Sequence, residues 1–143
     1  MALVEEREAT ALVNAWLYVA FADGEVDESE QATLEERVAE LYPVLPEGAF
    51  ARMFGKAIVT AGMSEPEELL EFIEPDTDDE AERLLTNLIV IAGRNGGLDD
   101  DDRRRFDRLA RTCGYDRAET AALCTQVARD HDLHPETLAP QST

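Results

Sequence analysis

The chain carries the stretch Asp23-Gly24-Glu25-Val26-Asp27-Glu28-Ser29-Glu30, and a second version, Asn95-Gly96-Gly97-Leu98-Asp99-Asp100-Asp101-Asp102, follows 72 residues later. Each version places a glycine after an Asp or Asn, an aliphatic residue two positions on, and then further acids. The glycine permits a tight turn, because it enters left-handed backbone conformations without steric cost. Asp27 can then cap a helix, with Glu30 completing a capping box. Each stretch is therefore predicted to be an acidic turn that leads into a helix.

Apolar residues with helical spacing precede and follow both stretches. The two stripes before the first stretch recur before the second at the same 72-residue offset. They are Leu12, Trp16, Val19 and Val13, Leu17, Ala20 in the first copy, and Leu84, Leu88, Ile91 and Leu85, Ile89, Ala92 in the second. After the stretches, Leu34, Val38 and Leu41 are matched by Phe106, Ala110 and Cys113. Stripes of this period are typical of buried helices, so we predict a duplicated helical hairpin.

The rest of the chain also has the pattern of helices, and no stretch alternates as a strand does. Further helices are predicted at about residues 47–61, at 64–73 as a short connector, and at 116–130, where Asp116 and Glu119 form a capping box. The predicted fold is therefore all-α: one seven-helix domain over residues 1–134, followed by a polar tail at 135–143. Two pseudo-repeats, at about 3–61 and 78–131, are joined by the short helix.

The charge balance restricts the possible partners. The chain of 143 residues has 32 acidic and 13 basic residues, giving a formal net charge of −19. Nucleic acids and anionic membranes require basic surfaces, so neither is expected as a partner, whereas cations and basic proteins are. A biased genome composition or a salt-adapted acidic surface would explain the same charge without any partner, and we favour that interpretation of the overall charge. No apolar run approaches the length of a membrane span. With two cysteines and no signal-peptide pattern at the N-terminus, a cytoplasmic location is expected.

The acidic stretches match the second half of an EF-hand calcium loop. With Gly24 at the invariant glycine position, Asp27 and Glu30 fall on later ligand positions. The two leading ligands would fall on Val19 and Phe21, which are apolar, so a complete EF-hand is excluded. Half a loop supplies too few oxygens for tight binding on its own, but two copies brought together could form one site. Carboxylate ligands favour calcium, with magnesium or manganese as alternatives.

The stretch from Ala22 to Glu30 resembles the Ala-Asp-Gly-x-aliphatic…Glu motif of TerB-like domains, an all-helical family named for a tellurite-resistance protein. The second copy departs from that motif, with Arg94 for Ala, Asn95 for Asp and Asp102 for Glu. The resemblance implies a divalent-cation or protein-interaction module in a stress-response system, possessing no established enzymatic chemistry, with a basic or co-chaperone-type protein as a possible partner. It implies metal contacts at Asp23, Asp27 and Glu30, and weaker ones at Asn95, Asp99 and Asp102.

An alternative interpretation needs no metal, because acids at a helix start stabilise the helix by themselves. In the second copy, Asp99, Asp100 and Asp101 each have an arginine four residues on, at Arg103, Arg104 and Arg105, which would compete with a cation. The domain would then be a purely structural or protein-interaction module. A metal-dependent hydrolase is a weaker alternative, since no catalytic motif is present. His131 and His134 fit a helix C-terminus better than a metal site, and both cysteines fit the core.

Overall fold

The computed structural model describes residues 2–20, 28–63, 73, 77–94 and 100–133, which form six helices and no strand. The prediction of an all-α fold is confirmed. The chain divides into two compact units, Met1–Glu74 and Pro75–Thr143. Most of the predicted helix at 64–73 lies outside the described residues, and residue 73 itself is not helical. The count of seven helices, the single domain and the pseudo-repeat therefore stay predictions.

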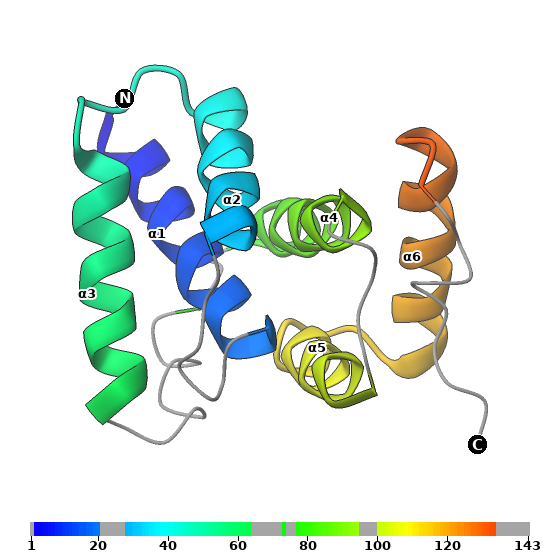
Figure 1. The fold of residues 1–143 in the computed structure, drawn as a ribbon. Helices are drawn as coiled ribbons and strands as arrows, with labels where there is room; N and C mark the ends of the chain where they lie inside the picture. Colours follow the sequence, from blue (N-terminus) through cyan, green and yellow to red (C-terminus); the bar gives the residue numbers. More distant parts are fainter. Residues whose placement is uncertain (1, 21–27, 64–72, 74–76, 95–99, 134–143) are drawn as a thin grey trace. The chain divides into compact units, whose positions relative to one another are not determined.

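The first unit contains α1 (Ala2–Ala20), α2 (Glu28–Leu41) and α3 (Ala49–Met63), and α1 packs along α3 (Figure 1). The predicted double stripe of α1 is buried at five of its six positions, namely Leu12, Val13, Trp16, Leu17 and Val19. The sixth position, Ala20, is outside the residues whose side chains are described. Each large aliphatic side chain buried in this way stabilises the fold by roughly 1.5–3 kcal/mol.

A proline follows the end of α2, and a glycine precedes the start of α3. Helix α2 buries Leu34 and Val38 and ends at Leu41, just before Pro43. Helix α3 begins two residues later than the sequence predicted. Gly48 precedes it with a φ of +83°, a left-handed conformation that interrupts helical geometry and favours glycine. On α3, the rings of Phe50 and Phe54 stack with their centroids 5.5 Å apart.

The second unit contains α4 (Asp78–Arg94), α5 (Asp100–Thr112) and α6 (Arg117–Asp130), with α4 and α5 both packed against α6 (Figure 1). All six predicted stripe positions of α4 are buried. On α5, Phe106 and Ala110 are buried, as predicted, and Cys113, the residue after its end, is half-buried.

Capping residues mark the helix ends of the second unit, and the capping box predicted at Asp116 and Glu119 is confirmed. Thr77 Oγ1 accepts a hydrogen bond from the Glu80 N–H at 3.1 Å, which caps α4. The Asp116–Glu119 capping box of α6 is present in both directions, at 2.8 and 3.1 Å. Gly114, at a φ of +93°, ends α5. No helix among the described residues is both long enough and apolar enough to cross a membrane.

Candidate functional site

The structure describes only part of the predicted metal site. Asp23 and Asp27 of the first acidic stretch, and Asn95 and Asp99 of the second, lie outside the described residues. Glu30 is the third residue of α2, but its side chain is also outside the description. Asp102 is the third residue of α5 and is the one predicted ligand whose side chain is described.

Asp102 is engaged by an arginine of its own helix. The Arg105 Nη2 donates a hydrogen bond to Asp102 Oδ1 at 2.7 Å, and the Asp102 side chain is 19% exposed. Arg104 similarly pairs with Asp101. The sequence predicted ion pairs between each aspartate and the arginine four residues later, whereas in these two pairs the arginine follows three residues after the aspartate. An arginine that already neutralises Asp102 would compete with any cation for that carboxylate.

Arg103, in contrast to the exposed Arg104, is buried in the second unit and is only 4% exposed. Its Nε donates to Asp107 Oδ1 at 3.1 Å, and its guanidinium lies over the Phe106 ring, 5.5 Å from the centroid. Its charge also acts on the Cys124 thiol of α6, where it opposes the rise in pKa that burial causes. Burying an unpaired guanidinium would be very costly, so these partners are what make its position tenable. Sequence reasoning treated Arg103 as a surface cation. The sequence does contain a signal for its burial, because Arg103 lies three residues before Phe106, on the apolar stripe of α5.

The two cysteines are free thiols with little tendency to ionise. Burial raises the pKa of Cys113 to about 11. Burial also raises the pKa of Cys124, and the Asp107 carboxylate adds to that rise, although Arg103 acts in the opposite direction. Because the thiolate is the nucleophile and the metal ligand, neither cysteine is poised for such chemistry at neutral pH. Cys124 is buried, as its apolar position predicted.

The structure gives little support to a histidine site. His131 is exposed and is the C-cap residue of α6, where its backbone N–H bonds the Val127 carbonyl, and His134 lies outside the described residues. Among the side chains that the structure describes, no group of three or more His, Cys, Asp or Glu residues could hold a metal ion. Of the acids in the first acidic stretch, only Glu28 is among these described side chains.

A pocket of about 210 Å³ opens between α1 and α3 of the first unit, and sequence reasoning did not predict it. Helix α1 contributes Glu6, Thr10 and Asn14, which recur every four residues and so share one face. Helix α3 contributes two cations one turn apart and two buried apolar residues: Arg52, Lys56, Met53 and Ala57.

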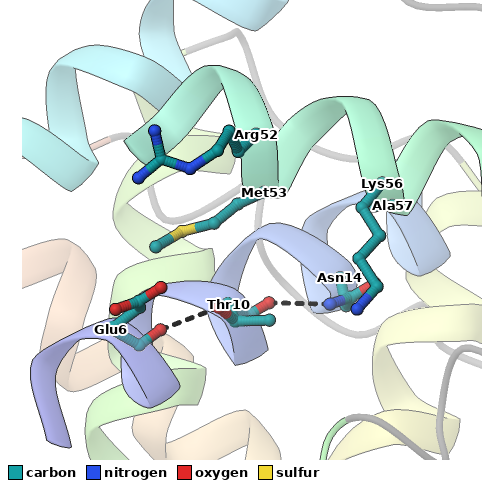
Figure 2. Close-up of a pocket in the computed structure, with 7 residues that line it drawn as sticks. All are labelled: Glu6, Thr10, Asn14, Arg52, Met53, Lys56 and Ala57. Carbon is teal, nitrogen blue, oxygen red and sulfur yellow. Dashed lines mark hydrogen bonds between the residues drawn. The ribbon is translucent and has the colours of Figure 1, made fainter. Parts of the chain in front are cut away.

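The α1 wall of the pocket is fixed by hydrogen bonds to its own backbone. Thr10 Oγ1 donates to the Glu6 carbonyl at 2.8 Å, and Asn14 Nδ2 donates to the Thr10 carbonyl at 2.9 Å. Figure 2 shows Lys56 reaching from α3 toward Asn14, while Arg52 and Met53 lie at the Glu6 end of the pocket. Asn14 is only 6% exposed, so its amide is a buried polar group held in a defined orientation at the pocket.

Comparisons of the chain with protein-family models, with curated proteins and with solved structures found no match.

Proposed function

We propose that the chain is a non-enzymatic, TerB-like helical module that binds a divalent cation, calcium in the first instance, through the acidic stretch Asp23–Glu30. Because half a loop supplies only part of the oxygen ligands that calcium takes, we expect this binding to be weak. The observation that supports this proposal is a difference between the starts of α2 and α5. In α5, the acid at the third helical position, Asp102, is paired with Arg105. The residue that corresponds to Arg105 in α2, 72 positions earlier, is Thr33.

The first acidic stretch has no basic residue nearby in the sequence. The chain contains no Lys or Arg between Arg7 and Arg37, and the Asp23–Glu30 stretch contains five acids. Like charges gathered at one turn repel each other, and a bound divalent cation would relieve that repulsion. The second stretch carries its own arginines, so we assign it the structural role of a helix start. The metal-free alternative is thus adopted for the second copy.

The pseudo-repeat belongs to the same proposal. Each unit begins with a helix whose double apolar stripe is buried, and in each unit that helix packs against the third helix of the unit. Within α2 and α5, the buried Leu34 and Val38 correspond to the buried Phe106 and Ala110 at the same 72-residue offset. These correspondences support a duplicated hairpin. The proposal places the module in the cytoplasm, in a stress-response system with a basic or co-chaperone-type partner, on the strength of the resemblance and the acidic charge.

Thermal unfolding with and without calcium tests the proposal. A ligand that binds only the folded state stabilises it by roughly 2.7 kcal/mol at one hundred times its dissociation constant. We expect saturable stabilisation that Asp23→Asn and Glu30→Gln abolish. The matched control is the double variant Asp78→Asn/Asp79→Asn, which removes two exposed charges at the start of α4. Equal loss of the calcium response in this control would show that calcium responds only to overall charge, contrary to the proposal.

A further inference from the structure

Helix α3 has a charge opposite to that of the chain as a whole. Among the six described helices it is the one that contains no acidic residue, and its charged residues are Arg52 and Lys56. The chain has a net charge of −19, and Lys56 is its single lysine. A locally cationic helix in so acidic a chain points to an anionic ligand at this place, because an anion would be repelled from most other surfaces.

The two cations face the same pocket. Residues four apart on a helix lie on one side with their Cβ atoms about 5–6 Å apart. Figure 2 shows the two side chains directed to different ends of the pocket, so both approach one carboxylate after rotation of these exposed side chains. The lining carries two positive charges and one negative charge, from Glu6, which gives a net charge of +1. A ligand with a single negative charge, a monoanion, therefore matches the charge of the pocket. The Glu6 carboxylate would oppose the second negative charge of a dianion such as phosphate.

The apolar part of the pocket sets a second requirement for the ligand, which is an alkyl group. Met53 and Ala57, which directly follow Arg52 and Lys56 along α3, are buried. They offer an alkyl group a surface away from water, worth about 0.8 kcal/mol for each buried methylene. A volume of about 210 Å³ corresponds to about seven water-sized groups, which limits the ligand to a short chain.

We propose that the pocket between α1 and α3 binds a small monocarboxylate that has a short alkyl chain. Arg52 and Lys56 hold the carboxylate, Asn14 contributes a fixed polar contact, and Met53 and Ala57 receive the chain. This site is separate from the cation site proposed at Asp23–Glu30, because none of its lining residues belongs to that stretch.

Titration of the full chain with sodium butyrate, followed by two-dimensional amide NMR at constant ionic strength, tests the site. We expect saturable shifts that concentrate in α1 and α3. Arg52→Gln and Lys56→Gln should each weaken binding by about tenfold, as expected for a lost charged hydrogen bond. Both side chains are exposed, so the variants should fold normally. The matched control is Arg111→Gln, an exposed arginine of α5 outside the pocket, which should leave the affinity unchanged.

Butylamine and inorganic phosphate serve as competing probes of the same size range. We expect butylamine to produce no saturable shifts and phosphate to bind more weakly than butyrate. Butyrate shifts that fail to saturate, an affinity that survives loss of both cations, or tighter binding of either competing probe would each overturn the proposal. Repeating the butyrate titration with the Asp23→Asn variant separates this site from the cation site, because the butyrate affinity should not change.

Discussion

Arg105 lies one helical turn after Asp102 on α5, and its Nη2 donates a hydrogen bond to Asp102 Oδ1 at 2.7 Å. Both side chains are partly buried, with 27% and 19% of their surfaces exposed. The pair gives α5 an internal counter-charge at its acidic start. It is also the feature that separates the second acidic stretch from the first, where the corresponding residue is Thr33.

A double-mutant cycle on this pair should show a favourable coupling. Asp102→Asn and Arg105→Gln should each lower the free energy of unfolding, with a coupling energy of about 0.5–1 kcal/mol, the range for partly exposed ion pairs on helices. Urea unfolding of the two single variants and the double variant measures the coupling. Strictly additive single effects would mean that the contact contributes nothing to stability.

The buried Arg103 should be far more sensitive to substitution than its neighbour Arg104. Arg103→Ala removes the salt-bridge partner of Asp107 and the positive charge beside the Cys124 thiol, so we expect a loss of about 2–4 kcal/mol. Arg103→Met, which restores apolar volume, should lose less. Arg104→Ala is the control, since the Arg104 side chain is 74% exposed, and it should cost under about 1 kcal/mol. If chemical denaturation gives equal losses of stability for Arg104→Ala and Arg103→Ala, the buried position of Arg103 is contradicted.

Alkaline pH should destabilise the chain through its cysteines. Burial raises the folded-state pKa of Cys113 from 9.0 to about 11. Between these values the unfolded chain loses its thiol proton while the folded chain keeps it, so the free energy of unfolding falls as pH rises from 9 to 11. Below pH 9 this contribution is constant. Cys113→Ala should reduce the slope in that window, as measured by urea unfolding at pH 8, 9, 10 and 11. An unchanged slope would show that the Cys113 thiol ionises as easily in the folded state as in the unfolded state.

Local patterns predicted the helices well because their causes lie within a few residues. The stripes of α1 and α4, the capping box at Asp116 and the turn at Gly114 are all short-range features. Helix α3 was placed two residues too early, because the sequence does not reveal that Gly48 adopts a positive φ.

The sites were harder to predict because they depend on packing between helices. Arg103 is paired with Asp107 within α5, but its burial depends on the packing of α5 against α6, which places Cys124, 21 positions away in the sequence, close to it. The pocket joins Glu6 on α1 to Arg52 on α3, and only the packing of those helices brings the two together. The acids Asp23, Asp27, Asn95 and Asp99 lie outside the described residues, so their role as ligands stays a prediction.

Calcium binding measured by isothermal titration calorimetry, with stoichiometry determined, tests the central claim most directly. At constant ionic strength, the chain should bind one calcium ion in a saturable event. Asp102→Asn should leave that event intact, because Asp102 is assigned to α5 stability, whereas Glu30→Gln should abolish it. Absence of saturable binding at millimolar calcium, or loss of binding in Asp102→Asn with retention in Glu30→Gln, would contradict the assignment of the cation site to Asp23–Glu30.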